Sequence, residues 1–233
     1  MTQRIPPPRA VLFDLFDTLV PAMASTDDFP PTWEDLGVSV DAYQKRWMQN
    51  HDGRATGRIR DPVEVLRVVV HDLVAGFPME RLRWATDRRI RRFEHVLTSA
   101  DARIVGAVAR LKASGVKVAL VSNACVGEIE AWPRSPLAAH FDAAVFSCDV
   151  GVAKPDPGIY EEALRRVDTA PADALFVGDG GSSELRGARE AGLGTVLVSG
   201  WAMRHWSHAM AARREFADWE FDGVPEFVEA ALA

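Results

Sequence analysis

The chain has 233 residues, of which 48% are hydrophobic and 26% charged, the usual balance of a soluble globular protein with a sizeable core. Its formal net charge of -6 argues against non-specific binding to nucleic acid, which needs a basic surface. No apolar stretch reaches the roughly 18 residues that span a membrane, and two cysteines are too few for a disulfide framework. Because the first residues are polar and proline-rich, without an apolar signal region, we expect a cytoplasmic protein.

The first predicted element is a strand at residues 10–16. The run is short and almost wholly apolar, and Asp17 and Thr18 follow it. This pattern is typical of a strand that is buried on both faces of a parallel sheet. It places Asp14 near the carboxyl end of the strand.

Residues 21–99 are rich in Arg, Trp and Asp and show helical spacing of their apolar residues. Asp61 and Pro62 suit the N-cap and the first position of one of the helices. We expect a helical cap domain over 21–99, inserted between 1–20 and 100–233 of one core domain, within the size range of small domains. A basic cluster at Arg88, Arg89, Arg91 and Arg92 forms either a solvated helix face or a surface that attracts an anionic substrate.

From residue 101 onward, apolar strand-like runs alternate with helical patterns. Strands are predicted at 116–121, 143–148, 174–177 and 195–198, with helices between them and an edge strand and a helix in the last segment, 217–233. The alternation predicts an α/β protein, with a Rossmann-like parallel sheet core that carries helices on both faces, plus the small helical cap domain.

Polar residues follow several of these strands at the point where each one ends. They are Asp14, the pair Ser122-Asn123, and Asp179, while Lys154 comes a few residues after another strand. Ligands of open α/β sheets bind beyond the carboxyl ends of the strands, so we expect these side chains to converge on one site. Taken singly, each residue also suits a turn or a solvated loop.

The residue types fit the chemistry of group transfer from an anionic substrate. The Asp14 carboxylate can act as a covalent nucleophile, and the Lys154 ammonium can neutralise developing charge. Ser122 and Asn123 offer hydrogen-bond donors. Asp179 suits a hard cation such as Mg²⁺, and Glu184 either orients a metal-bound water or complements the N-terminus of its helix.

In their order and flanking sequences, these residues resemble the motifs of the haloacid dehalogenase superfamily over residues 10–20 and about 100–233. Asp14 with Thr18 matches the first motif, Ser122 the second, Lys154 the third, and Asp179 with Glu184 the fourth. The resemblance implies that Asp14 is the nucleophile. It also implies that Asp14, the Phe16 carbonyl, Asp179 and Glu184 form a Mg²⁺ site, and that the cap selects the substrate.

Phe16 departs from the pattern of the phosphatases of this superfamily, most of which carry a general-acid aspartate at that position. Asp17 comes one residue later, and because side chains alternate along a strand it cannot be assumed to replace that acid. Superfamily members that cleave carbon–halogen bonds carry an aromatic residue there, since a halide leaves without a proton. Asp179 favours a phosphatase, because an aspartate at this position suggests a Mg²⁺ site and those dehalogenases use no metal.

We therefore expect a Mg²⁺-dependent phosphatase acting on a small phosphorylated metabolite, with no nucleic-acid or membrane partner. One alternative is a metal-independent 2-haloacid dehalogenase, and another is a catalytically weak homologue that binds phosphometabolites or serves regulation. In each case the ligand is a small anion. The cap residues that we consider for its selection are Trp33, Arg46, Trp47, His51, Arg54 and Arg58.

Overall fold

The computed structural model describes residues 5–22, 28–71, 73–74 and 76–233, and its centre is a six-stranded parallel sheet. The strand order is β3-β2-β1-β4-β5-β6, and every pair of neighbours is parallel. The strands are β1 (Ala10–Phe13), β2 (Lys117–Ser122), β3 (Ala143–Phe146), β4 (Ala174–Gly178), β5 (Gly194–Val198) and β6 (Trp219–Phe221).

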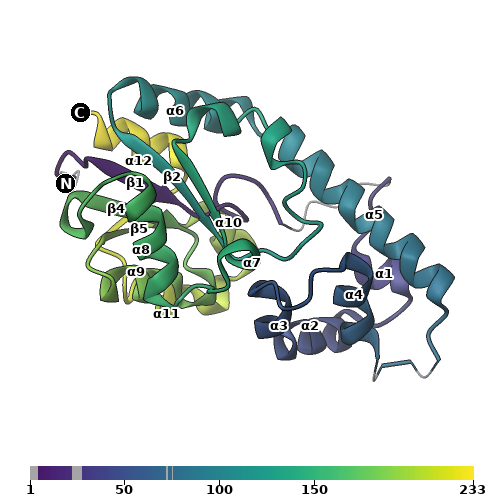
Figure 1. Ribbon diagram of the computed structural model, residues 1–233. Coiled ribbons are helices and arrows are strands. Elements are labelled where there is room, and N and C mark those ends of the chain that lie inside the picture. Colours follow the sequence, from purple (N-terminus) through teal and green to yellow (C-terminus); the bar gives the residue numbers. More distant parts are fainter. Residues whose placement is uncertain (1–4, 23–27, 72, 75) are drawn as a thin grey trace.

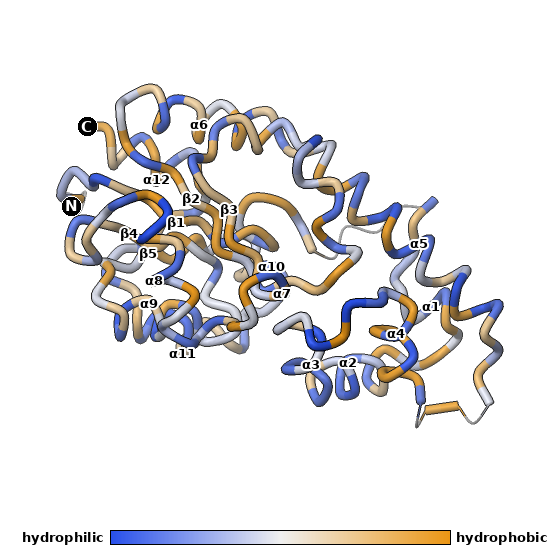
Figure 2. Tube along the Cα trace, viewed as in Figure 1, coloured by the Kyte–Doolittle hydropathy of each residue, from blue (hydrophilic) through white to orange (hydrophobic). Residues whose placement is uncertain are grey.

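The central strands are apolar along their whole length because both of their faces are covered. Every residue of β1 and β4 is buried, and the strands form the hydrophobic centre of the core in Figure 2. Successive residues alternate between the faces, so Val11 and Phe13 join one hydrophobic cluster and Leu12 joins the other. The continuous apolar runs in the sequence are therefore the signature of a two-sided parallel sheet.

Helices cover both faces of the sheet (Figure 1). On one face, α6 (Ala102–Ala113) packs against α12 (Val224–Ala231), and on the other lie α8 (Pro157–Arg166) and α9 (Glu184–Glu190). Asp101 and Asp156 cap α6 and α8, because their side chains accept hydrogen bonds from backbone N–H groups of the first turn. The predicted Rossmann-like α/β fold is confirmed.

The helical segment between β1 and α6 has a hydrophobic cluster of its own, and Figure 1 shows it beside the sheet. Its helices are α1 (Thr32–Leu36), α2 (Val40–Gln49), α3 (His51–Ala55), α4 (Pro62–Val70) and α5 (Met79–Thr98). Asp61 caps α4 and Pro62 is its first residue, as expected. Residues 23–27, 72 and 75 of the predicted cap lie outside the described residues, and its limits at 21 and 99 stay a prediction.

The remaining helices are short and join the strands at the edges of the sheet. They are α7 (Ser147–Val150), α10 (Gly200–His205), α11 (Met210–Arg214), and the 3-10 turns η1 (Trp132–Arg134), η2 (Ala138–His140), η3 (Pro171–Asp173), η4 (Gly181–Ser183) and η5 (Ser207–Ala209). Among the helices of the described ranges, none combines the length and the apolar character needed to cross a bilayer.

Two predicted strands were too long. β1 ends at Phe13 instead of residue 16, because the chain turns back and the N–H groups of Leu19 and Val20 both donate to the Leu15 carbonyl. β3 ends at Phe146 instead of Cys148, because residues 147–150 form α7. In both places buried side chains continue past the strand, because Leu15 after β1 and Cys148 after β3 stay in the interior although the ladder of hydrogen bonds has ended.

Candidate active site

The site lies at the centre of the sheet, where the order in which successive strands are added changes from one side of β1 to the other. β1 is flanked by β2 on one side and β4 on the other, so the connections from β1 and β4 leave the sheet edge in opposite directions. Such a switch point opens a crevice at the carboxyl ends of the strands. Asp14 directly follows β1, and Asp179 directly follows β4.

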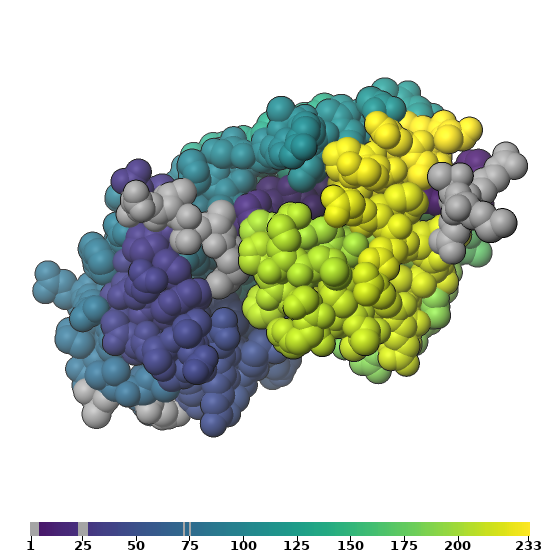
Figure 3. Space-filling view, turned by 180° about the vertical axis from the view of Figure 1, so that it is seen from behind, coloured from purple at the N-terminus to yellow at the C-terminus, as the bar shows by residue number. Residues whose placement is uncertain are grey.

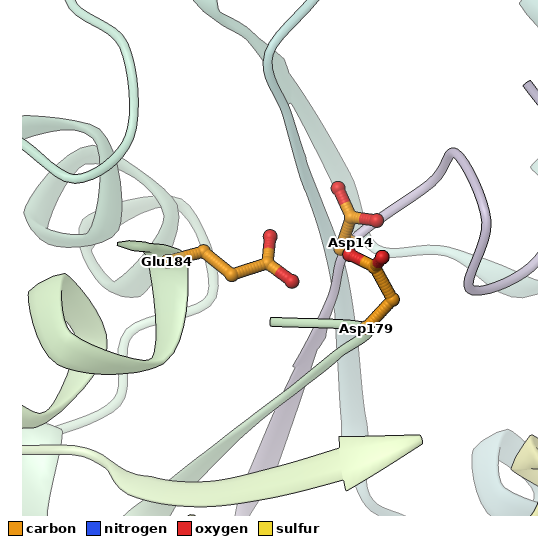
Figure 4. Close-up of side chains that lie close together, drawn as sticks. All are labelled: Asp14, Asp179 and Glu184. Atoms are coloured by element: carbon orange, nitrogen blue, oxygen red, sulfur yellow. The ribbon is translucent and has the colours of Figure 1, made fainter. Parts of the chain in front are cut away.

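Three carboxylates meet in this crevice. Asp14, Asp179 and Glu184 each offer an oxygen, and these oxygens all lie within 4.8 Å of one another. Figure 4 shows the three side chains converging from the ends of two strands and from the start of α9. All three residues are buried. The predicted convergence of Asp14 and Asp179, which are far apart in sequence, is present in the structure.

Lys154 lies between two of the carboxylates. Its Nζ is 2.5 Å from Oδ1 of Asp14 and 2.6 Å from Oε2 of Glu184. Thr18 donates a hydrogen bond of 2.9 Å to the other oxygen of Asp14. Lys154 is almost completely buried, so its charge is compensated by these carboxylates instead of water.

Asn123 holds the loop that carries this lysine. Its Nδ2 donates to the Lys154 carbonyl at 2.9 Å, and its Oδ1 accepts from the Lys154 N–H at 2.7 Å. We expected Asn123 to donate to substrate, and that role stays a prediction. The structure adds a positioning role, because a two-point contact fixes the backbone from which the Lys154 side chain starts.

Ser122, the last residue of β2, is fully buried, and its hydroxyl has no hydrogen-bond partner among the described residues. A buried polar group without a partner costs about 1–3 kcal/mol. A ligand oxygen in the crevice would remove this cost, which supports the predicted role of Ser122 as a donor to an anion.

Arg213 is a residue of this site that the sequence analysis missed. Its Nη1 donates to the Asp179 carboxylate and, at 2.5 Å, to the Asp179 carbonyl. Arg213 belongs to α11 and is separated from Asp179 by 34 positions. Nothing in the surrounding sequence singles it out, because it follows no strand and belongs to no motif.

The charges of the crevice do not balance. Within the described residues, the three clustered carboxylates contact two cationic side chains, Lys154 and Arg213. Burial raises the pKa of Asp14, an effect that Lys154 opposes and Asp179 reinforces. Burial likewise raises the pKa of Glu184 well above its usual value. The pKa of Lys154 is also raised, because the attraction of Asp14 and Glu184 outweighs burial, so the lysine stays protonated.

These residues fit a hard divalent cation. The donor set consists of carboxylate oxygens, the ligands that Mg²⁺ prefers, and the excess of negative charge favours a further cation. Phe16, whose carbonyl was predicted as another ligand, follows Asp14 by two positions in the loop after β1.

A cavity of about 570 Å³ lies between this crevice and the helical segment. Phe16, Asp17, Asn123 and Arg213 line its sheet side, and α1, α2, α3 and α5 line the other. Figure 3 shows the neighbouring surfaces, with the yellow-green segment of α10 and α11 beside the blue and purple helices. A more open hollow of about 900 Å³ lies at the amino ends of the strands, away from the carboxylates.

Phe16 and Asp17 both line this cavity but differ in their surroundings. The Phe16 ring packs edge-to-face on Phe93 of α5, with 5.3 Å between ring centroids. Asp17 has a left-handed backbone with φ of 64°, and its Oδ1 accepts a hydrogen bond of 2.8 Å from Ala22. Burial raises the pKa of the Asp17 carboxyl to about 7.

The basic cluster on α5 is divided between solvent and interior. Arg91 is exposed, but Arg89 and Arg92 are buried and line the cavity, so a solvated face is wrong for these two. Their spacing could have shown this, because they continue the helical period of buried positions that includes Ala85 and Val96.

Of the cap residues considered for substrate selection, four border the cavity, and their role in selection stays a prediction. Trp33, Trp47, His51 and Arg54 line the cavity. The lining, as far as the described residues define it, does not include Arg46 or Arg58. It does include Glu128, which the sequence analysis did not single out.

A family model described as haloacid dehalogenase-like hydrolase matches residues 8–192 of the chain. Among curated proteins, glyceraldehyde 3-phosphate phosphatase of Methanopyrus kandleri is 34% identical over 96 residues, 41% of each chain. Phosphoserine phosphatase of Thermus thermophilus is 36% identical over 92 residues, 39% of this chain and 37% of that protein. The chain therefore spans about two fifths of the length of the curated relatives that it matches.

Solved structures of similar fold match nearly the whole chain at low identity. L-2-haloacid dehalogenase from Xanthobacter autotrophicus superposes with a TM-score of 0.70 at 16% identity, covering 97% of this chain and 99% of that one. CbbY from Rhodobacter sphaeroides, in complex with phosphate, superposes with a TM-score of 0.58 at 22% identity, covering 94% and 96%. At these identities the likeness shows the fold alone.

Proposed function

Because the chain belongs to the family of haloacid dehalogenase-like hydrolases, we propose that it is a Mg²⁺-dependent phosphatase of a small phosphorylated metabolite. The family assignment confirms the resemblance that the motifs indicated. The observation that carries the proposal is the convergence of Asp14, Asp179 and Glu184 on one point beside Lys154. A cation is useful for hydrolysis of a charged phosphate ester, and a carbon–halogen bond does not need one.

In the proposed reaction, a carboxylate oxygen of Asp14 attacks phosphorus, the bond from phosphorus to the ester oxygen breaks, and that oxygen takes a proton from water and leaves as an alcohol. Water then hydrolyses the aspartyl-phosphate and restores the carboxylate. Lys154 and the hydroxyl of Ser122, which has no partner among the described residues, would donate hydrogen bonds to the phosphoryl oxygens and stabilise the charge that develops there. Mg²⁺ held by Asp14, the Phe16 carbonyl, Asp179 and Glu184 would supply further positive charge to those oxygens.

A second candidate function, 2-haloacid dehalogenase, is favoured by Phe16. Its aromatic ring, packed on Phe93, stands where a phosphatase of the family carries its proton donor. A halide leaves without a proton, so an apolar side chain at this position suits that reaction. The Asp179 carboxylate supports the phosphatase instead, because it lies beside Asp14 and Glu184, where the three carboxylates would together hold a divalent cation near the nucleophile.

The test is a screen of small phosphate esters with and without Mg²⁺, run beside halide release from 2-chloropropionate. We expect phosphate release that chelation of the metal abolishes, and that Asp14→Asn removes without changing the melting temperature by more than a few degrees. Halide release that persists without metal would establish the dehalogenase instead. Binding of phosphometabolites without any turnover would identify a catalytically weak homologue.

A further inference from the structure

Three buried arginines line the helical side of the cavity. Arg54 of α3 and Arg89 and Arg92 of α5 have exposed fractions of 5%, 6% and 7%. A buried charge is costly unless an opposite charge or a set of hydrogen bonds compensates it. The contacts of each guanidinium therefore decide whether its charge is compensated.

Only one of the three has a carboxylate partner in the described part of the chain. Arg89 forms an ion pair with Glu128, and both side chains are buried. Glu128 also accepts a hydrogen bond of 2.7 Å from the Cys125 N–H, so it is held in the loop that follows β2. This pair joins α5 to the sheet, which gives Arg89 a structural role.

The hydrogen bonds and the ring contact of Arg54 are all with uncharged groups among the described residues, and the carboxylate of Glu128, which attracts its charge from a distance, is paired with Arg89. Its Nε and Nη2 each lie 3.3 Å from the Trp47 carbonyl, and its guanidinium carbon lies 3.6 Å from the centre of the Trp47 ring. These contacts orient the guanidinium on an aromatic face but do not neutralise it.

Arg92 is held in the same way. It donates to the Pro30 carbonyl at 3.3 Å and to the Thr32 hydroxyl at 3.1 Å, and its Nε has no partner among the described residues. Burial and the neighbouring Arg89 lower the pKa of Arg92 to about 10. A guanidinium in this position is stabilised by any anion that enters the cavity.

We propose that Arg54 and Arg92 bind a second anionic group of the substrate, a carboxylate or a second phosphate. The substrate is then a small phosphate ester with an acidic group at its other end. Arginine suits this task because its planar guanidinium pairs with both oxygens of a carboxylate or phosphate. A cavity of about 570 Å³ accommodates such a metabolite.

This inference rests on the proposed phosphatase function for the end of the substrate that reacts at Asp14. The second end is recognised across the cavity, between the sheet side with Phe16 and Asn123 and the helical side with Arg54 and Arg92. The aromatic rings of Trp47 and Phe93 line the same cavity, so the part of the substrate between its charged ends contacts apolar surface.

The first test uses the unmodified protein and three matched sets of compounds. These are alkyl phosphates, ω-carboxyalkyl phosphates and alkanediol bisphosphates of increasing chain length. At the best length we expect kcat/KM for an acidic compound to exceed that for the alkyl phosphate by roughly tenfold to a hundredfold, the value of one hydrogen-bonded charge pair. The carboxylated and bisphosphate sets show which acidic group is preferred.

The possible failures are distinguishable. Equal kcat/KM for acidic and alkyl phosphates overturns the anionic subsite and leaves the phosphatase function standing. If no compound is hydrolysed, the proposed function fails, and the rise in melting temperature with each compound then decides the subsite. Equal rises for acidic and alkyl compounds would overturn it.

The second test changes the arginines. In Arg54→Met and Arg92→Met, we expect the preference for acidic over alkyl phosphates to fall at least roughly tenfold, mainly through KM. The matched control is Arg91→Met, because Arg91 is exposed on the same helix as Arg92. Melting curves identify any variant that fails to fold, in which case the other arginine carries the test. Unchanged preference in both folded variants contradicts the proposal.

Discussion

Arg213 shares the Asp179 carboxylate with any cation that enters the crevice. It donates to the carboxylate and to the carbonyl of the same residue, and its side chain is only 13% exposed. A guanidinium on a metal ligand weakens metal binding, because the two positive charges compete for the same oxygens. At this site the net charge, and not only the number of carboxylates, sets the affinity for a cation.

Arg213→Gln should therefore tighten the binding of Mg²⁺. We expect the concentration that gives half-maximal activity to fall roughly fivefold, corresponding to about 1 kcal/mol of removed competition. A titration of phosphatase activity with Mg²⁺ measures this change. The control is Arg214→Gln, since Arg214 is bonded to Glu220 instead. An unchanged or higher half-maximal concentration in Arg213→Gln would contradict the competition.

Phe16 stands at the position where the resemblance in sequence places the proton donor of the family's phosphatases. If the missing proton donor limits turnover, Phe16→Asp should raise kcat for esters of poorly leaving alcohols by roughly a hundredfold. The gain should be smaller for a nitrophenyl ester, whose leaving group needs little protonation. Steady-state kinetics on the two ester types measure the gain in kcat. A melting curve detects any loss of stability from the lost packing on Phe93. Equal kcat in mutant and parent would show that proton donation is not limiting.

At the scale of elements, the buried ion pair between Arg89 and Glu128 joins α5 to the loop that follows β2. Removing one member of a buried pair leaves the other charge uncompensated, which costs more than the pair contributes. Both carboxylate oxygens of Glu128 are used, because one accepts a hydrogen bond from Arg89 and the other accepts one from the Cys125 N–H.

Glu128→Gln should lower the free energy of unfolding by about 3–5 kcal/mol, measured by urea denaturation. The matched control is Glu94→Gln on α5, which removes the exposed pair with Arg134 at 2.8 Å. That variant should lose less than about 1 kcal/mol, because solvent screens an exposed pair. A loss of similar size in both variants would show that burial does not decide the strength of the pair.

The same pair predicts how stability depends on pH. Burial tends to raise the pKa of Glu128, but the charges of Arg89 and Arg54 outweigh it and hold the pKa below the usual value of 4.5. A lowered pKa in the folded state stabilises the protein above the pKa of the unfolded chain, and this stabilisation is lost as pH falls. The melting temperatures of the parent and Glu128→Gln should therefore converge as the pH falls below about 4.5. A difference that stays constant at acid pH would contradict this.

At the scale of the whole molecule, the helical segment touches the sheet core at Gly57. A Cβ at this position would lie 1.9 Å from the Cys148 carbonyl oxygen, so the backbones touch directly. Arg60 donates to the same carbonyl at 3.3 Å and pairs with Asp149 at 3.2 Å. This contact helps to set how Arg54 and Arg92 face the crevice that holds Asp14, Asp179 and Glu184.

Gly57→Ala should push α3 away from α7 and lower kcat/KM by up to roughly a hundredfold, since small misplacements of binding groups are costly. Gly76→Ala is the control, because Gly76 has nearly the same backbone, with φ of 64° against 68°, and an added Cβ there would have no atom of the described residues within 4 Å. Both variants carry the same backbone strain, so only the steric effect separates their kinetics. Equal kcat/KM in the two would show that this contact does not control the site.

The sequence by itself determined the sheet and the residues at its edge. A strand buried on both faces needs an uninterrupted apolar run, and parallel strands bring their carboxyl ends to one side, so Asp14, Ser122 and Asp179 could be placed together before any coordinates. The sequence placed the ends of β1 and β3 too late in the chain. Hydrophobicity reports burial, and the chain stays buried after it leaves the sheet.

Only the tertiary structure decided the partners of the charged residues outside the motifs. Arg213 pairs with Asp179 across 34 positions and Arg89 with Glu128 across 39, and no local pattern relates such distant residues. Arginine is usually exposed, so its occurrence on a helix predicts solvent contact unless the opposing surface is known. The excess of positive charge in the cavity, and the substrate class that it indicates, follow from how α3 and α5 face the sheet.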